Sequence, residues 1–220
     1  MTAAAGGPVV IVLAAGGSQR LGRDKLLEDI GGMPMLQRTV ACYTKASRVG
    51  DVLVVLGPDQ KPTWQWLASL RVHLIENPHP GRGMISSIRV GLGSAWAKDK
   101  VFLLAPGDVP FVKPEVVDKL LVDFRTRSPQ ILIPTYKGLG GHPGVYAASV
   151  QSDFFMHGDT SGAKEILLRH RDRTLRLAVP DPDVCFDIDT EADLRIATDP
   201  GARWARVDAE AEARAQSRHG

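Results

Sequence analysis

Short apolar runs alternate with amphipathic segments from Val9 to Thr126, and no other feature of the sequence restricts the fold as strongly. The runs are rich in Val, Ile and Leu, which is typical of strands buried on both faces, and they lie at residues 9–14, 51–58, 72–76 and 101–108. Apolar residues at helical spacing predict helices from Pro34 onward and over residues 84–96 and 114–126. We therefore expect a parallel sheet with helices on both faces.

The second half of the chain is less regular. Two strands are expected close together in the sequence, over residues 130–136 and 142–148, which favours an antiparallel element. The remaining expected elements are a helix over 163–170, a strand over 175–179, a strand end at 187–190 and a helix over 191–197. The prediction is an α/β, Rossmann-like three-layer fold with a mostly parallel sheet and an added antiparallel element in the C-terminal half. A single domain would cover residues 1–199, and residues 200–220, rich in Ala, Arg and Glu, would form a frayed or disordered tail.

Charge and composition exclude several classes of protein. The net charge of +2 is too small for a nucleic-acid-binding surface. No apolar run approaches the ~20 residues of a membrane span, and the first residues lack the basic region of a signal peptide. Cys42 and Cys185 are far apart and are expected to be reduced thiols. We expect a cytoplasmic protein with neither nucleic acid nor membrane as a partner.

The loop after the first expected strand combines glycines with cations in the sequence "GGSQRLGRDK". Ligands of such sheets bind beyond the carboxyl ends of the strands, which is where this loop lies. The main-chain N–H groups of Gly16 and Gly17 can converge on an anion, and Arg20 and Lys25 can add charge-assisted contacts. A tight turn whose cations face water has the same composition, so both interpretations stay open.

Two standard phosphate motifs are not met in this loop. The dinucleotide fingerprint G-x-G-x-x-G is absent, which argues against an oxidoreductase. Gly17 and Gly22 have the spacing of the P-loop G-x-x-x-x-G-K-[ST], but Arg23 and Asp24 stand where Lys and a hydroxyl residue are required. Without that hydroxyl, a magnesium ion needs ligands from another part of the chain.

Asp108 is the first candidate for a metal ligand. It lies in the turn "GDVP" after a buried strand, and a carboxylate at the sheet edge suits Mg²⁺, which fills its other positions with water and phosphate. The alternative is that Asp108 caps its own turn. Asp187 and Asp189 are the second candidates, because residues two apart lie on one face of an extended segment. Their alternative role is local, since Asp and Thr190 are favoured where a helix starts at Glu191.

The segment "LAAGGSQRLGRDK", residues 13–25, resembles the L-A-[AG]-G-x-S-x-R-x-G-x-x-K signature of nucleotidyltransferases that act on molybdenum cofactor and on sugar or alditol phosphates. Further segments follow in the order of the molybdopterin cytidylyltransferase branch: "NPHPGRGMISSIRVGL", "GDVP", "GHP", "GDTSGAKEIL" and "DIDTEADL". This resemblance covers residues 9–197. The sequence departs from the family pattern at Val109, Lys164 and Glu191, none of which removes a charged group from the expected site.

The resemblance implies that CMP is transferred from CTP to the terminal phosphate of a molybdopterin, with release of pyrophosphate and with Mg²⁺ as cofactor. Lys25, Arg20 and Asp108 would be the catalytic residues, the two cations lying on the triphosphate. Asp108 and Asp189 would hold the metal. Residues 1–199 would then be a nucleotidyltransferase domain, and a molybdoenzyme or its insertion chaperone is implied as a partner.

The matching positions also imply two sets of binding residues. The nucleotide-binding set is Leu13, Ala14, Ala15, Gly16, Gly17, Arg20, Lys25, Gly83, Ser86 and Ser87. The acceptor-binding set is His142, Pro143 and Asp159. Other roles stay open: Ser86 and Ser87 can cap a helix, His142 can be a turn residue, and Asp159 can be an acid at a helix N-terminus. Related guanylyltransferases tend to have Gly where Ala15 stands, so its methyl group favours CTP.

Two other functions are compatible with these motifs. A guanylyl- or cytidylyltransferase for a sugar or alditol phosphate would share the first loop and Asp108, but "GHP" and "DIDT" in this order are not expected there. A non-catalytic chaperone that holds the cofactor would need neither Lys25 nor a metal-binding carboxylate.

Overall fold

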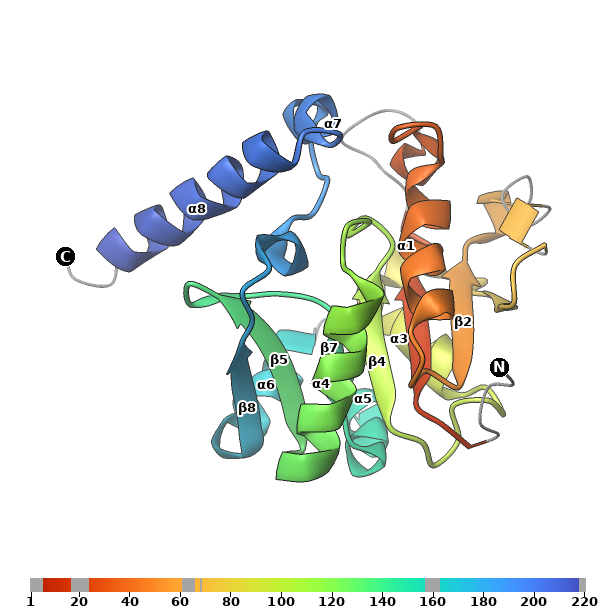
Figure 1. Ribbon diagram of the computed structural model, residues 1–220. Helices are drawn as coiled ribbons and strands as arrows, with labels where there is room; N and C mark the ends of the chain where they lie inside the picture. Colours follow the sequence, from red (N-terminus) through yellow and green to blue (C-terminus); the bar gives the residue numbers. More distant parts are fainter. Residues whose placement is uncertain (1–5, 17–23, 61–65, 68, 157–162, 218–220) are drawn as a thin grey trace.

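A computed structural model describes residues 6–16, 24–60, 66–67, 69–156 and 163–217. Three residues expected in the site, Gly17, Arg20 and Asp159, lie outside these described ranges. Within them, eight strands form one sheet in the order β3-β2-β1-β4-β7-β5-β6, with β8 paired to β5 (Figure 1). The strands are β1 (Val9–Leu13), β2 (Asp51–Leu56), β3 (His73–Glu76), β4 (Phe102–Pro106), β5 (Ile131–Tyr136), β6 (Leu139–Gly140), β7 (Gly144–Tyr146) and β8 (Thr174–Ala178).

The sheet has a parallel half and a mixed half. β1 pairs in parallel with both β2 and β4, and β2 pairs in parallel with β3. β7 lies antiparallel between β4 and β5, β6 is antiparallel to β5, and β8 is parallel to β5. The expected α/β fold with a mostly parallel sheet and an antiparallel element in the C-terminal half is confirmed.

β1 is buried on both faces, which explains its unbroken apolar sequence. Val10 and Val12 belong to the core beneath α1 and α4, whereas Val9 and Ile11 point to the opposite core with α3. Figure 1 shows α1 and α4 in front of the sheet and α3, α5 and α6 behind it, so the molecule has three layers. These helices are α1 (Met35–Lys45), α3 (Met84–Leu92), α4 (Pro114–Arg127), α5 (Gln151–Met156) and α6 (Ala163–Arg169).

Two expected elements differ in the structure. The helix expected to reach Trp96 ends at Leu92, because Gly93 and Ser94 are poor helix formers and the Ser94 hydroxyl donates to the carbonyl of Gly91. Residues 187–190 form no strand. They cross beyond the carboxyl end of β4, where the N–H of Ile188 donates to the carbonyl of Asp108 at 3.0 Å.

The C-terminal segment forms a long helix, α8 (Pro200–Gln216), in place of the expected frayed or disordered tail. Asp199 caps it by accepting from the N–H groups of Gly201 and Ala202. Its buried side chains include Val207 and Ala211, so small apolar residues hold it where large ones are scarce. Among the described residues, none of the helices is both long and apolar enough to cross a membrane.

Candidate active site

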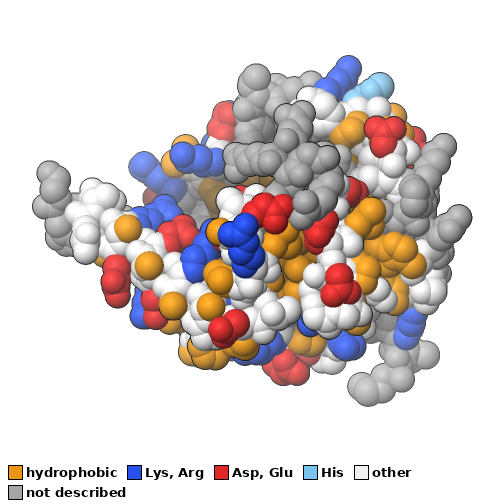
Figure 2. Space-filling model, turned by 90° about the horizontal axis from the view of Figure 1, so that it is seen from above, with side chains coloured by type: hydrophobic (Ala, Val, Ile, Leu, Met, Phe, Trp, Pro, Cys, Tyr) orange, Lys and Arg blue, Asp and Glu red, His pale blue; other side chains and the backbone are white. Residues whose placement is uncertain are grey.

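Three of the expected site residues, Lys25, Asp108 and Asp189, meet at the carboxyl ends of β1 and β4, which lie at the top of the sheet in Figure 1. Asp108 follows β4 by two residues, Lys25 follows the loop after β1, and Asp189 precedes α7 (Glu191–Ile196). Figure 2 looks onto this face and shows acidic and basic side chains next to one another. Segments far apart in the sequence thus meet at one edge, as the parallel topology requires.

Lys25 lies at the centre of this site, at the start of the short 3-10 helix η1 (Lys25–Leu27). Its ammonium donates to Asp108 Oδ2 at 2.8 Å, to Asp189 Oδ1 at 2.8 Å and to the carbonyl of Ile188 at 2.9 Å. The Lys25 side chain is 14% exposed and that of Asp189 is 40% exposed, so the lysine lies deeper in the protein than Asp189. The structure brings these three predicted residues into direct contact.

The surroundings of Lys25 keep it charged. Burial by itself lowers the pKa of the ammonium, because it removes water from the charged form. The charge of Asp108 and the hydrogen bonds to Asp108 and Asp189 act in the opposite direction and prevail, so the pKa of Lys25 is raised above its ordinary value. A fixed positive charge therefore stands between two carboxylates at neutral pH.

The three oxygens around Lys25 form a donor set that suits a hard cation. Mg²⁺ accepts carboxylate and carbonyl oxygens and completes its octahedron with water and phosphate. In this structure the cation that the oxygens hold is the ammonium of Lys25. By their chemistry, the same oxygens fit a magnesium ion in place of that ammonium.

The main chain around Asp108 is fixed from several sides. The N–H of Gly107 donates to the carbonyl of Leu13 at 3.0 Å, and the buried Thr39 hydroxyl donates to the carbonyl of Gly107 at 2.8 Å. The carbonyl of Asp108 itself accepts from Ile188. The backbone bonds hold the turn, which leaves the Asp108 carboxylate to face Lys25.

The structure separates the two aspartates between which the sequence does not choose. Asp189 contacts Lys25, whereas the Asp187 carboxylate pairs with Arg206 of α8 at 3.3 Å. The two side chains therefore have different partners. Asp189 shares the ammonium of Lys25 with Asp108, whereas Asp187 pairs with Arg206.

Thr190 caps α7, as the sequence predicts. Its hydroxyl accepts from the N–H of Asp193 at 3.2 Å, and the Asp193 carboxylate accepts in return from the N–H of Thr190 at 2.9 Å. The same carboxylate oxygen also accepts from the N–H of Asp189 at 3.1 Å. The cap thus fixes the backbone of the residue that contacts Lys25.

The described part of the glycine-rich loop continues directly from β1. The N–H of Ala14 donates to the carbonyl of Val55 at 2.9 Å, so the sheet pairing extends one residue past Leu13. Ala15 is buried, and Gly16 is exposed with open space on the side where a Cβ would stand. The backbone therefore leaves the sheet at Gly16, at the edge where the site lies.

Ser86 and Ser87 are engaged inside the protein. The buried Asn77 amide donates to the Ser86 hydroxyl at 2.8 Å and to the Ser87 hydroxyl at 3.0 Å. Ser86 in turn donates to the carbonyl of Gly83 at 2.8 Å, in the first turn of α3. Gly83 has a φ of 85°, which favours glycine at this position. The structure thus shows the serines stabilising the loop-to-helix junction, and their contact with a nucleotide stays a prediction.

The "GGHP" turn lies beside the carboxylates. The N–H of His142 donates to the carbonyl of Val184 at 2.7 Å, and the bond to Pro143 is cis. A Cβ on Gly141 would stand 2.5 Å from the same carbonyl oxygen, so only glycine fits there. The turn is therefore held against the segment that leads to Asp189.

His142 lines a cavity and is exposed at the protein surface. Protein atoms around its ring replace part of the water and lower the pKa of the imidazole, although the charges of Asp108 and Asp187 act in the opposite direction. A neutral imidazole is therefore favoured near neutral pH, able to accept one hydrogen bond and to donate another.

A cavity of about 620 Å³ opens next to the carboxyl ends of β1 and β4. Its floor is apolar, with side chains from β1, β4, β5, β7, α3 and α6. Four cations line it as well: Lys164, Arg171, Arg176 and Arg214. The cavity also includes His142, which connects it to the site around Asp108.

Three residues of this region were missed by the sequence analysis. Asn77 donates to the hydroxyls of Ser86 and Ser87. Asp193 accepts from the N–H groups of Asp189 and Thr190, and Arg206 pairs with the carboxylates of Asp187 and Asp193. The T-x-x-D spacing of Thr190 and Asp193 was the available signal for the second of these. Arg206 had none, because it stands in a segment without a clear apolar pattern.

The fold and this site together define a Rossmann-like α/β domain with a charged ligand site beyond β1 and β4. The model of the MobA-like NTP transferase domain family matches residues 10–174. The chain therefore belongs to this family.

Curated relatives act on different nucleotides and acceptors. A probable molybdenum cofactor guanylyltransferase of Pyrococcus furiosus is 27% identical over 128 residues, which are 57% of this chain and 59% of that protein. A 2-C-methyl-D-erythritol 4-phosphate cytidylyltransferase of Cereibacter sphaeroides is 30% identical over 119 residues, 53% of each chain. The chain spans less than two thirds of the length of either relative.

Solved structures share the fold. Rv0371c from Mycobacterium tuberculosis H37Rv has a TM-score of 0.72 at 24% identity, covering 88% of this chain and 98% of that one. The complex of the same protein with manganese has a TM-score of 0.68 at 23% identity, with the same coverage.

Proposed function

We propose that this chain transfers CMP from CTP to the terminal phosphate of a molybdopterin and releases pyrophosphate. The observation that carries the proposal is the contact of Lys25 with Asp108 and Asp189 at the sheet edge, beside a cavity lined by cations. The motifs that resemble the molybdopterin cytidylyltransferase branch agree with this assignment.

The nucleotide is proposed to bind at the glycine-rich loop, with its triphosphate on the loop amides, Arg20 and Lys25. Asp108 and Asp189 would hold Mg²⁺, which when bound neutralises charge on the phosphate oxygens. The oxygen-only donor set supports this assignment.

Lys25 has two tasks in this proposal. In the free protein it neutralises Asp108 and Asp189, and so keeps two carboxylates close together that would otherwise repel each other. With nucleotide present, its charged ammonium exchanges these oxygens for phosphate oxygens. The attacking group is a phosphate, which is already ionised near neutral pH, so the protein's main contribution is to align two anions and offset their repulsion.

The cavity beside the site is proposed to bind the acceptor. Its lining combines apolar side chains with the cations Lys164, Arg171, Arg176 and Arg214. An apolar floor with cations suits a flat ring system that carries negative charge. This favours a pterin phosphate over a sugar or alditol phosphate.

The choice of CTP rests on the family pattern at Ala15. Its methyl group is buried at the start of the loop and leaves less room than glycine for a large base. The curated relatives include a guanylyl- and a cytidylyltransferase, so the base is the part of the proposal to test first.

Pyrophosphate release with CTP, GTP, UTP and ATP, each with and without molybdopterin, tests the proposal. Release that depends on the pterin and prefers CTP supports it. Preference for GTP would make the chain a guanylyltransferase, and release with a sugar or alditol phosphate in place of the pterin would reassign the acceptor. No release with any nucleotide would favour a cofactor-holding chaperone.

A variant in the cavity separates acceptor binding from nucleotide binding. Arg176→Ala is expected to raise the KM for the pterin about tenfold or more, because a charge-assisted contact is lost, and to leave the KM for CTP unchanged. Lys45→Ala is the matched control, because Lys45 is an exposed lysine at the end of α1 that does not line the cavity. A molybdoenzyme or its insertion chaperone is the partner we propose for the product.

A further inference from the structure

Helix α8 places Arg206 against the segment that carries Asp189. The Arg206 guanidinium pairs with Asp193 Oδ1 at 3.2 Å and with Asp187 Oδ1 at 3.3 Å. The Asp193 side chain is 7% exposed, so one of these two ion pairs is largely shielded from water. Arg206 therefore connects α8 to both ends of a short segment, residues 187–193, that includes Asp189.

Asp193 passes this connection to the site. Its Oδ1 faces Arg206, and its Oδ2 accepts from the N–H of Asp189 at 3.1 Å, the N–H of Thr190 at 2.9 Å and the Thr190 hydroxyl at 2.8 Å. The Asp193 carboxylate thus fixes the backbone at Asp189 and Thr190. The other oxygen of this carboxylate is held by Arg206.

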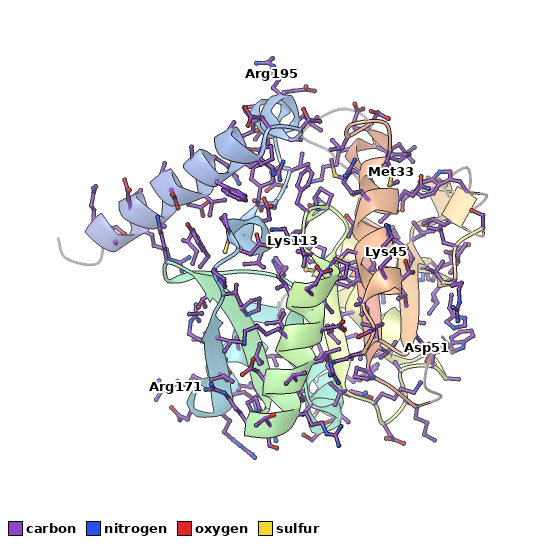
Figure 3. All side chains as sticks on the ribbon, viewed as in Figure 1. Met33, Lys45, Asp51, Lys113, Arg171 and Arg195 are labelled. Carbon is purple, nitrogen blue, oxygen red and sulfur yellow. The ribbon has the colours of Figure 1, made fainter. Side chains whose placement is uncertain are left out.

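A second arginine anchors α8 itself. Arg203 pairs with the buried Asp183 at 3.0 and 3.2 Å, donates to the carbonyl of Ala197 at 2.6 Å and lies over the Phe111 ring at 3.7 Å. Nearby, Lys113 pairs with Asp181 at 3.0 Å, and Figure 3 shows Lys113 between α4 and α8. These contacts of Arg203 fix the turn of α8 that precedes Arg206.

We propose that Arg206 is a positioning residue for the nucleotidyl transfer: it holds Asp193 and Asp187 so that Asp189 stays beside Asp108. The inference rests on the proposed function, because it assumes that Asp189 binds the metal. Its physical reason is charge. When Lys25 turns to a phosphate, Arg206 is the cation of α8 that continues to offset the carboxylates of this segment.

The test measures Mn²⁺ binding to the full chain, by electron paramagnetic resonance of free Mn²⁺ in the presence of α,β-methylene-CTP. Arg206→Ala is expected to raise the Mn²⁺ dissociation constant about 10–100-fold, the usual effect of removing a residue that orients a metal ligand. Arg206→Lys keeps the charge but lacks the fork that spans two carboxylates, so a smaller rise is expected. In the transfer assay, kcat should fall while the KM for the acceptor stays unchanged.

Two control variants separate positioning from simple docking of α8. Lys137→Ala removes the ion pair at 2.9 Å between the β5–β6 hairpin and Asp208 of α8, without touching the segment of Asp189. Arg195→Ala removes an exposed arginine of α7 that points away from the molecule in Figure 3. Both should bind Mn²⁺ like the unchanged chain. Equal weakening in Lys137→Ala and Arg206→Ala would overturn the proposal.

Asp189→Asn distinguishes this inference from the proposed function. If Asp189→Asn weakens Mn²⁺ binding and neither Arg206→Ala nor Arg206→Lys does, the positioning role is wrong and the metal site stands. If Asp189→Asn binds Mn²⁺ like the unchanged chain, the metal assignment is wrong and the inference falls with it. Both Arg206 variants are included because Arg206 is about one third exposed, so that at least the conservative one should fold.

Discussion

The parallel half around β1 and the C-terminal edge around α8 supply the same site by different means. β1, β2 and β4 are buried between two apolar cores, and their carboxyl ends position Asp108 through main-chain bonds. The segment of Asp189 lies outside the sheet and is held by ion pairs and capping bonds to Asp193, Arg206 and Lys25. The first side is held by the sheet and its main-chain bonds, and the second combines ion pairs with the buried side chains of Phe186 and Ile188.

This difference has a consequence for stability and function. Apolar packing is insensitive to what binds at the edge, whereas a network of charges responds when a phosphate or a cation arrives. The parallel half is therefore the fixed side of the site, and the segment that carries Asp189 is the side whose contacts can be exchanged.

Asp108→Asn should have the largest effect on activity. It removes a charge from the fixed side without changing shape, and kcat is expected to fall on the order of a hundredfold or more. Pyrophosphate release under saturating substrates measures it. Asp123→Asn on α4, whose carboxylate faces Lys119 and Arg127, should behave like the unchanged chain, and near-normal turnover of Asp108→Asn would contradict its role.

Arg203→Ala should have the largest effect on stability. Asp183 would be left buried and unpaired, which typically costs about 3–5 kcal/mol. Urea unfolding followed by circular dichroism measures the loss. A change below about 1 kcal/mol would show that α8 is not held by this pair.

Ile11→Ala sharpens the comparison from the side of the sheet. Ile11 is fully buried in β1, and truncation is expected to cost about 2–5 kcal/mol of unfolding free energy. The folded fraction should keep its Mn²⁺ affinity, because the carboxylates are not moved. A loss of Mn²⁺ affinity in fully folded Ile11→Ala would mean that the two sides are not separate.

The smallest expected effect is a pH dependence from Lys25. Its pKa is raised on folding, so its contribution to stability is fully present below the unfolded value of about 10.4 and is lost as pH rises through the higher folded value. The difference in melting temperature between the unchanged chain and Lys25→Met should be constant near neutral pH. It should shrink only above the unfolded pKa of about 10.4. A difference that shrinks between pH 6 and 8 would contradict the sign of this shift.

The same contrast explains what the sequence predicts and what it does not. Unbroken apolar runs such as 9–14 identify buried strands, and strand ends locate Asp108 and the loop before Lys25. Large apolar side chains are scarce in α8, because its buried face consists of Arg203, Val207 and Ala211, and Asp183, the partner of Arg203, lies in another segment. The choice between Asp187 and Asp189 likewise depends on which of them Arg206 neutralises, and this requires the folded structure.

The resemblance of the motifs to a known family predicts some site contacts correctly and leaves others untested. It groups Lys25, Asp108 and Asp189, which the structure brings together. It also suggests Ser86 and Ser87 as ligand contacts, whereas their hydroxyls accept from Asn77 in the structure. A hydroxyl's partner depends on the buried residue opposite it, which spacing alone does not give.

The central claim is that Lys25 and a divalent cation take turns on the same oxygens, and a crystal structure with Mn²⁺ and α,β-methylene-CTP tests it most directly. The account predicts an anomalous manganese peak between Asp108 and Asp189, with the Lys25 ammonium moved onto a phosphate oxygen. A structure in which Lys25 still bridges both carboxylates, with the nucleotide bound and the manganese held elsewhere, would contradict it.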